Sequence, residues 1–186
     1  MAPASRILLV CGSLRSGSTN AAMLATAAAV APPGVDAVPF EGMGELPHFN
    51  PDDDFDPLPE RVVRLRAEID RSAAVLFCTP EYAGALPGSF KNMLEWTVGG
   101  PEMYRRPAGW VNVAGAGRGE ATHEQLRAVL GYIHADLVEG ACTRIPLDRS
   151  LVGADGLVHD PGIRERLTAV LVALADHAAR NPRESY

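Results

Sequence analysis

The sequence predicts an α/β fold with a mostly parallel sheet covered by helices on both faces. Two observations support this fold class. Five short apolar runs alternate with five amphipathic stretches, as in sheets whose parallel strands are joined by crossover helices. Most of the runs are continuous and rich in Val, Ile, Leu, Phe and Ala, which is typical of strands buried on both faces. With 186 residues, 47% of them hydrophobic, the chain is expected to form a single domain over residues 1–186.

The apolar runs are the predicted strands. The first contains Ile7-Leu8-Leu9-Val10 and breaks into a polar segment with glycines, and the third leads directly into Thr79-Pro80. No internal repeat or low-complexity linker separates the runs, so we expect all five in one sheet. The predicted strands cover residues 6–12, 35–40, 73–79, 109–114 and 141–145.

The stretches between and after the strands are predicted as helices. The last one has Asp160 at its N-cap and Pro161 at its first helical position, which is a typical helix start. In the second one, apolar residues recur at helical spacing among charged neighbours, and this stripe comprises Val62, Val63, Leu65, Arg66 and Ile69. The predicted helices cover residues 20–30, 59–71, 87–97, 122–134 and 161–180.

Charge and composition exclude several classes of partner. The net charge is −6 and the 17 basic residues are scattered, which argues against nucleic-acid binding. The densest basic group alternates with acids and is predicted to be a solvated helix face; it comprises Arg61, Arg64, Arg66 and Arg71. No segment approaches the roughly 18 apolar residues that a membrane span needs, and residues 1–6 do not resemble a signal peptide. We therefore expect a soluble, cytoplasmic protein that does not bind membranes.

The three cysteines do not indicate a metal site. Cys11, Cys78 and Cys142 are far apart in the sequence, and no pair has the spacing of metal ligands. We expect all three to be reduced and buried as small apolar side chains.

Ligands of such sheets bind outside the carboxyl ends of the strands, where the strand order reverses. The first segment expected there is Gly-Ser-Leu-Arg-Ser-Gly-Ser-Thr-Asn, residues 12–20. Its hydroxyls and backbone N–H groups are hydrogen-bond donors, Arg15 adds a guanidinium, and a helix N-terminus follows, so the segment is predicted to bind phosphate. The alternative is a polar turn in which Ser18 caps the helix.

Spacing separates the known kinds of phosphate loop. Gly12 and Gly17 have the spacing of a P-loop, but the lysine of that motif is missing, and the second glycine of a dinucleotide fingerprint is missing as well. Cys11 and Arg15 enclose three residues, too few for a small tyrosine-phosphatase loop. The remaining interpretation is a cradle for a single phosphate monoester, of the kind that a flavodoxin-like fold uses for FMN.

A second unusual segment, residues 79–92, follows the third predicted strand. Its small residues Ala83, Gly84 and Ala85 allow the backbone to approach a flat ligand closely. Tyr82 offers an aromatic wall for a ring system. An ordinary tight turn is the alternative interpretation.

Three blocks, taken in order, resemble the NADPH-dependent FMN reductase family, which includes flavin, quinone, azo and chromate reductases. They are Leu-Leu-Val-Cys-Gly-Ser-Leu-Arg-Ser-Gly-Ser-Thr-Asn (8–20), Leu-Pro-His-Phe-Asn-Pro-Asp (46–52) and Thr-Pro-Glu-Tyr-Ala-Gly-Ala-Leu-Pro-Gly-Ser-Phe-Lys-Asn (79–92). A weaker fourth block begins at Gly115. The resemblance implies a flavodoxin-like fold with a five-stranded parallel sheet in the order 2-1-3-4-5.

The resemblance also implies the residues of an FMN site. The FMN phosphate would be held by Ser13, Arg15, Ser18, Thr19 and Asn20. The isoalloxazine would be lined, mainly by backbone groups, by Pro80, Glu81, Tyr82, Ala83 and Gly84. Gly115 and its neighbours would close the other rim. The chain departs from the family pattern at Ala83, where Asn is frequent, and at Arg118 and Glu120 in the fourth block.

The activity implied is NAD(P)H oxidation through FMN by a ping-pong mechanism. The acceptor would be a quinone, a free flavin, an azo compound or a metal oxyanion, and the chemistry would need no catalytic side chain or metal. Family members are usually homodimers or homotetramers. Two alternatives stay open: a flavodoxin-like electron carrier without NAD(P)H activity, and a flavin-free regulatory module of the same fold.

Other polar residues are weaker candidates. His123 is near the fourth block and is expected to be exposed or to cap a helix, with substrate contact as the alternative. His48 lies in a loop with no nearby partner. Residues 52–54, Asp-Asp-Asp, are expected to form a solvated acidic loop, with a cation site as the alternative. Arg105 and Arg106 are candidates for contact with the 2′-phosphate of NADPH.

Overall fold

The computed structural model describes residues 4–182 and confirms the predicted fold class. All strand pairs are parallel, and the strand order is β2-β1-β3-β4-β5. This is the 2-1-3-4-5 order that the family resemblance implies. The strands are β1 (Ser5–Cys11), β2 (Val35–Pro39), β3 (Ala74–Cys78), β4 (Pro107–Asn112) and β5 (Asp136–Arg144).

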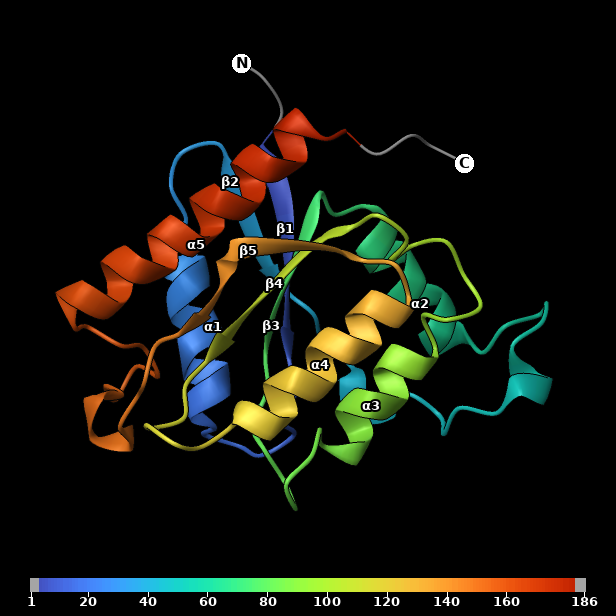
Figure 1. Cartoon of the computed structure of the whole chain (residues 1–186), viewed down its shortest axis with the longest axis horizontal. Helices are drawn as coiled ribbons and strands as arrows, with labels where there is room; N and C mark the ends of the chain where they lie inside the picture. The colour runs from blue at the N-terminus through green and yellow to red at the C-terminus, as the bar shows by residue number, and fades with distance from the viewer. Residues whose placement is uncertain (1–3, 183–186) are drawn as a thin grey trace.

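Helices cover both faces of this sheet (Figure 1). One face carries α1 (Thr19–Ala29) and α5 (Pro161–Arg180). The opposite face carries α2 (Glu60–Asp70), α3 (Gly88–Glu95) and α4 (Glu120–Tyr132). Three short 3₁₀ helices lie in the connections: η1 (Met43–Glu45), η2 (Pro51–Asp53) and η3 (Arg149–Leu151).

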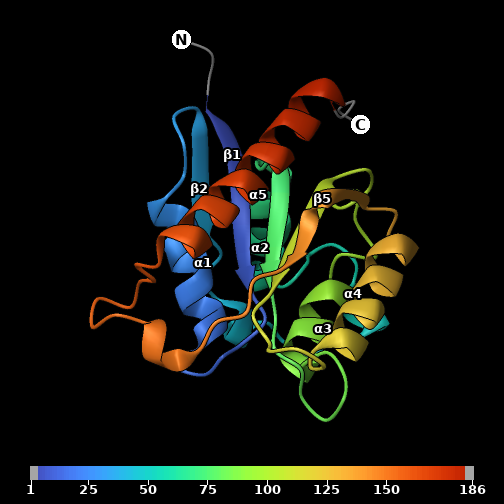
Figure 2. The ribbon, with the colours of Figure 1, turned by 60° about the vertical axis from the view of Figure 1, so that its left-hand side comes forward.

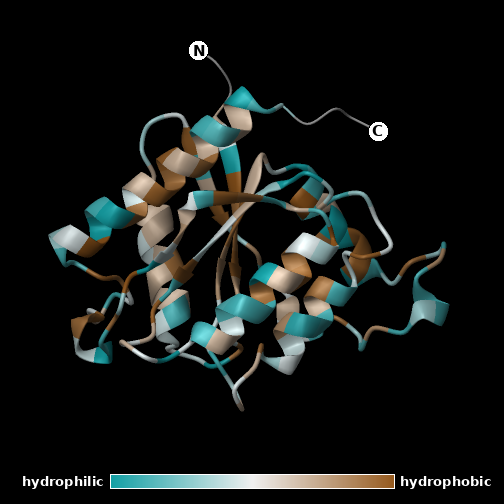
Figure 3. Ribbon diagram, viewed as in Figure 1, coloured by the Kyte–Doolittle hydropathy of each residue, from teal (hydrophilic) through white to brown (hydrophobic). Residues whose placement is uncertain are grey.

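Alternate residues of the central strands point into two separate cores. In β1, Ile7 and Leu9 face α1 and α5, while Leu8 and Val10 face the other three helices. All four are at most 1% exposed, which explains why the strand reads as a continuous apolar run. Figure 3 shows the apolar residues concentrated in the strands and the polar residues in the loops and outer helix turns.

The largest boundary error concerns β5, which starts five residues before its predicted first residue. The N-terminal part of β5 is at the edge of the sheet, and Glu139 and Gly140 in it are exposed. This half therefore lacks the continuous apolar pattern of a central strand. Beside it, the register of β4 against β5 shifts between Ala108 and Trp110, so part of β5 is also irregular.

Arg66 contradicts the prediction of a solvated basic face on the second helix. Its guanidinium donates to the Trp96 carbonyl at 3.0 and 2.9 Å and to Asp54 at 2.6 Å. The side chains of Arg66 and Asp54 are each only 11% exposed. The acidic loop is therefore not fully solvated, and Val63, predicted in the apolar stripe, is instead 50% exposed.

Arg106 is not placed to contact a cofactor at the ligand-binding edge. It precedes β4 directly and therefore lies at the amino end of the strands. The residue is 5% exposed, and its side chain donates to the carbonyls of Ser72 and Glu102. The proposed contact of Arg105 and Arg106 with a 2′-phosphate is wrong, because these residues lie at the opposite end of the sheet from the expected site.

The cysteine prediction is half correct. All three cysteines are free, and Cys78 is fully buried, but Cys11 and Cys142 are only half-buried. Within residues 4–182, no helix combines the length and the apolar character needed to cross a membrane.

Candidate functional site

Three loops gather at the carboxyl ends of the central strands (Figure 2). They follow β1, β3 and β4, and they surround a hollow of about 370 Å³, a size common among small-molecule sites. Five of the predicted site residues line the hollow: Thr19, Asn20, Pro80, Glu81 and Gly115. The other lining residues are Thr79, Asn112, Val113, Ala114, Arg118, Gly119 and Leu147.

The first loop leaves β1 in close contact with the end of β3. The Gly12 N–H donates to the Cys78 carbonyl at 2.9 Å. A Cβ atom on Gly12 would stand 2.5 Å from the Thr79 Cβ atom, so only glycine allows the two chain segments to approach this closely. The glycine at this position therefore brings the first and second loops together.

Ser18 is the N-cap of α1, as the capping alternative predicted. Its Oγ accepts from the Asn20 N–H at 3.2 Å and from the Asn20 Nδ2 at 3.4 Å. Asn20 Oδ1 in turn accepts a hydrogen bond from the Cys78 thiol at 3.3 Å. Ser18 and Asn20 are 5% and 4% exposed. In this structure their side chains therefore fix the start of α1. The positive end of the helix dipole faces the loop.

Arg15 and Ser13 occupy the outer part of the same loop. Arg15 is exposed, and its guanidinium forms no ion pair with any residue between 4 and 182. The Ser13 hydroxyl accepts from the Arg15 N–H at 3.3 Å and lies 3.5 Å from the Tyr82 hydroxyl. The first and second loops therefore meet in a polar contact, and Arg15 joins it through its backbone N–H.

The second loop contains a tight turn at Ala83 and Gly84. Tyr82 and Ala85 exchange both backbone hydrogen bonds at 3.0 Å. The φ angles of Ala83 and Gly84 are +51° and +72°, which is the type I′ pattern that favours Asn-Gly. Ala83 therefore adopts a left-handed conformation. This conformation is energetically unfavourable for any residue that has a Cβ atom.

This conformation predicts that Ala83→Asn stabilises the protein by roughly 0.5–1 kcal/mol, because asparagine tolerates the left-handed region better than alanine does. Urea unfolding of the flavin-free protein measures this change. Ala85→Asn is the matched control, since Ala85 follows the turn and does not have a positive φ. Equal effects of the two substitutions, or a loss of stability in Ala83→Asn, would contradict the turn assignment.

Helix α4 holds the second loop through residues that sequence reasoning did not select. The Thr122 hydroxyl donates to the Ala85 carbonyl at 3.0 Å, and its backbone N–H donates to Glu81 at 3.3 Å. Gln125 accepts from the Leu86 N–H at 3.1 Å. The Glu81 carboxylate is therefore tied to the N-terminus of α4. Only the tertiary contact between α4 and this loop reveals these roles.

The loop after β4 forms the other wall of the hollow. Asn112 Oδ1 accepts from the Ala114 N–H at 2.9 Å and fixes the turn out of the strand. Gly115 has open space around its Cα, and Arg118 lines the hollow. Glu120, in contrast, accepts from Arg144 at 3.1 Å and lines a neighbouring hollow instead. Arg118 and Glu120 are the two residues of the fourth block that depart from the family pattern. Of these two, only Arg118 lines the hollow between the three loops.

The block at residues 46–52 is fastened to α3 and the residue after it. Asn92 Oδ1 accepts from the Phe49 N–H at 2.7 Å, and its Nδ2 donates to the Pro47 carbonyl at 2.9 Å. The Trp96 indole N–H donates to the same carbonyl at 2.8 Å. Asn92 and this second block are therefore structural partners, and His48 between them is exposed.

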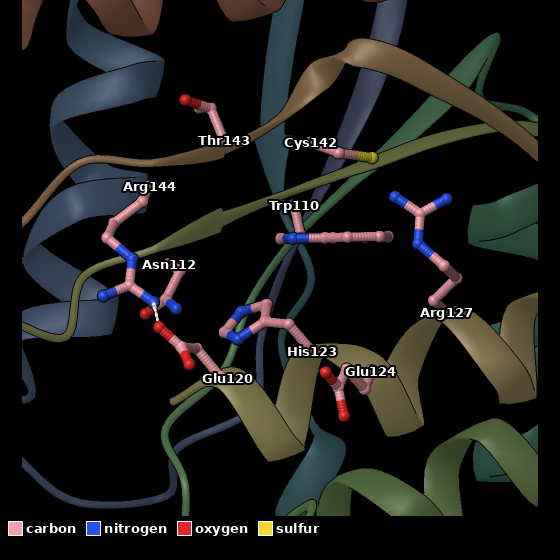
Figure 4. Close-up of a pocket in the computed structure, with 9 residues that line it drawn as sticks. All are labelled: Trp110, Asn112, Glu120, His123, Glu124, Arg127, Cys142, Thr143 and Arg144. Atoms are coloured by element: carbon pink, nitrogen blue, oxygen red, sulfur yellow. Dashed lines mark hydrogen bonds and ion pairs between the residues drawn. The ribbon is translucent and has the colours of Figure 1, made fainter. Parts of the chain in front are cut away.

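A neighbouring hollow of about 310 Å³ lies between α4 and β5 (Figure 4). His123 is 8% exposed, which contradicts the expectation of an exposed histidine. Its Nδ1 bonds the Gly119 carbonyl, and its ring packs against Trp110. Cys142 lines the same hollow, and burial raises the pKa of its thiol to about 11. At neutral pH this thiol is protonated and is therefore a poor nucleophile.

His123 predicts a pH dependence of stability. Burial, with a smaller contribution from the Arg144 cation, lowers the pKa of His123 below its ordinary value, and the Gly119 carbonyl and Glu81 oppose this shift. The unfolded chain therefore binds a proton at this residue at higher pH than the folded chain does. The stability from the neutral imidazole is present above the ordinary pKa of about 6.5 and is lost as the pH falls through the lower folded value.

We expect the free energy of unfolding of the wild type to fall more between about pH 7.5 and about pH 5 than that of His123→Gln. The other four histidines are unchanged in the variant, so the difference between the two pH profiles isolates His123. Urea unfolding at several pH values measures both profiles. Parallel profiles would contradict a lowered pKa.

Comparison with known proteins decides the family. A sequence model of the family described as NADPH-dependent FMN reductase matches residues 5–145. The chain belongs to this family. An NAD(P)H-dependent FMN reductase of Pseudomonas aeruginosa is 32% identical over 173 residues, which cover 91% of this chain and 92% of that protein. A quinone reductase of Pseudomonas putida is 32% identical over 178 residues, with coverage of 93% and 92%.

Solved structures agree with this membership. The flavoenzyme NAD(P)H:(acceptor) oxidoreductase FerB of Paracoccus denitrificans superposes with a TM-score of 0.82 at 27% identity, covering 95% of this chain and 98% of that one. A flavodoxin, WrbA-like protein of Agrobacterium tumefaciens has a TM-score of 0.63 at 17% identity, covering 95% of this chain and 99% of that one, which shows a shared fold only. Membership in the FMN reductase family confirms the expectations of an oxidoreductase on a flavodoxin-like fold, with FMN as cofactor and NAD(P)H as co-substrate.

Proposed function

We propose that this FMN reductase family member binds FMN in the hollow between its three loops and passes electrons from NAD(P)H to a small acceptor. The observation that carries this proposal is that the first loop, through Thr19 and Asn20, and the second loop, through Pro80 and Glu81, line one hollow. Arg15, in the first loop, has no ion-pair partner within residues 4–182. Such hollows outside the carboxyl ends of a doubly wound sheet are the usual ligand sites of the fold.

The residues present fit FMN. The phosphate would be held by Ser13, Arg15, Ser18, Thr19 and Asn20, at the N-terminus of α1 where the helix dipole favours an anion. The ring would lie against Pro80, Glu81, Tyr82, Ala83 and Gly84, with Gly115 at the opposite rim. Glycine and alanine at the turn and the rim support this placement, because they leave room for a flat ring beside the backbone.

When bound, FMN supplies the hydride and electron chemistry. The chain's own residues bind and orient it. Thr122 and Gln125 keep the second loop in place against the ring, and the Glu81 carboxylate is held by a backbone N–H. Since Glu81 is anchored in this way, we assign it a positioning role and no acid or base role.

The proposed kinetic order is ping-pong, and the acceptor class includes quinones, free flavins, azo compounds and metal oxyanions. In this order NAD(P)⁺ would leave before the acceptor enters, because both partners would react with the same bound flavin. Steady-state rates measured at several fixed acceptor concentrations test this order. Parallel double-reciprocal plots are expected with a benzoquinone and with free FMN as acceptors, and intersecting plots would contradict it.

We further propose that the protein is a homo-oligomer. A hollow of about 320 Å³ between α3 and α4 is lined by Leu94, Val98, Val129, Tyr132 and their neighbours. Val98 is 50% and Tyr132 77% exposed, and association of two copies would remove this apolar surface from water. Sedimentation velocity at micromolar concentration is expected to show a dimer or a tetramer, and a monomer would contradict the proposal.

A further inference from the structure

Arg149 brings a second guanidinium to the first loop from a distant part of the sequence. It is the first residue of η3, and Figure 2 shows this turn, in orange, beside the loop that precedes α1. A Cβ atom on Gly17 would lie 3.3 Å from Arg149 Nη2. The tip of the phosphate-binding type of loop and this guanidinium are therefore in immediate contact range.

The segment that carries Arg149 is fastened at both ends. Before it, the Leu147 N–H donates to the Val113 carbonyl at 3.0 Å. Within it, Asp148 accepts from the Ser150 backbone N–H at 2.9 Å and from its hydroxyl at 2.7 Å. After it, the Val158 N–H donates to the buried Thr26 hydroxyl of α1 at 2.9 Å. Arg149 is thus held beside the loop by a structured connection.

Three arginines near the first loop and the hollow have no carboxylate partner. Within residues 4–182, neither Arg15 nor Arg149 of this edge forms an ion pair, and Arg118, which lines the hollow, forms none either. The one carboxylate among the lining residues, that of Glu81, accepts from the Thr122 N–H. Elsewhere within residues 4–182, Arg61, Arg127 and several other arginines pair with a carboxylate, whereas Arg64 does not. In a protein of net charge −6, free guanidinium groups collected at one edge favour a dianionic ligand, and phosphate suits the planar donors of arginine.

We propose that Arg149 is a phosphate-monoester ligand of this site and acts together with Arg15. The proposal rests on the proposed function and adds to it a residue outside the segment that the family model matches. Two phosphate monoesters are available to such an enzyme: the 5′-phosphate of FMN and the 2′-phosphate of NADPH. Riboflavin lacks the first and NADH lacks the second, so the two sources can be separated experimentally.

The test compares Arg149→Gln with Arg64→Gln. Arg64 is an exposed arginine of α2, on the far face of the sheet, so the control removes the same charge away from the site. If FMN is the ligand, Arg149→Gln weakens FMN binding about tenfold and leaves riboflavin binding unchanged. If NADPH is the ligand, the variant raises KM for NADPH about tenfold and leaves KM for NADH and FMN binding unchanged.

A flavin-free measurement separates this proposal from the proposed function. Inorganic phosphate at millimolar concentration is expected to raise the Tm of the flavin-free wild type and of Arg64→Gln, and to raise that of Arg149→Gln distinctly less. This result supports the phosphate subsite even if the protein takes up no flavin. The proposal would be overturned if Arg149→Gln behaved like Arg64→Gln in all three measurements. These are the increase in Tm caused by phosphate, the affinity for FMN and the KM for NADPH.

Discussion

Arg15→Ala is expected to weaken FMN binding by about 10- to 100-fold while riboflavin binding changes far less. A hydrogen-bonded charge pair contributes about 1.5–3 kcal/mol, and each 1.4 kcal/mol is a factor of about ten in affinity. Arg15 is exposed at the first loop and has no carboxylate partner in the described part of the chain, so the substitution removes a ligand contact without leaving a buried charge behind. Quenching of flavin fluorescence on titration of the flavin-free protein measures both affinities.

The Arg15 prediction depends on the difference between the two flavins. Arg64→Ala, which removes an exposed arginine of α2 on the far face of the sheet, is expected to change neither affinity beyond twofold. Equal losses for FMN and riboflavin in Arg15→Ala would show that Arg15 supports the ring or the loop and does not bind the phosphate.

Arg66→Met is expected to lower the free energy of unfolding by about 3–5 kcal/mol, because it leaves the poorly exposed Asp54 carboxylate without its cation. It also removes both hydrogen bonds to the Trp96 carbonyl. Since Trp96 holds the Pro47 carbonyl, the loop at residues 46–54 is expected to loosen as well. Urea unfolding monitored by tryptophan fluorescence measures the change.

Arg61→Met is the matched control for this prediction. Arg61 is on the same helix and also lies 2.6 Å from a carboxylate, that of Glu45, but these two side chains are 48% and 56% exposed. Exposed ion pairs contribute about 1 kcal/mol or less. If Arg66→Met destabilises the protein no more than Arg61→Met does, burial of the Arg66–Asp54 pair does not stabilise this loop.

The central sheet could be predicted from sequence because its physical signal is local. A strand such as β1 is buried on both faces, and each of its residues therefore carries the same apolar signature. The start of β5 lacks this signature, because an edge strand exposes residues such as Glu139 and the register shift adds further irregularity. The boundary error follows directly from position in the sheet.

The loops of the candidate site could be located from sequence because their composition is distinctive: glycines, hydroxyls and one arginine close to a strand end. The supporting residues could not be predicted in this way. Thr122 and Gln125 contact the second loop, and Arg149 lies beside the first loop, across large sequence separations. An isolated threonine, glutamine or arginine has no distinctive local pattern. The expectations of a solvated Arg66 and an exposed His123 are wrong for a related reason, since a polar residue is buried only when a partner elsewhere in the chain can satisfy it.

Anaerobic addition of NADPH to the FMN-loaded protein tests the central claim most directly. The protein is expected to take up FMN, to show the visible absorption of an oxidised flavin, and to lose it in proportion to the NADPH added. Subsequent addition of a quinone is expected to restore that absorption. A protein that binds no FMN, or an FMN-loaded protein whose visible absorption is unchanged by NADPH and by NADH, would contradict the account.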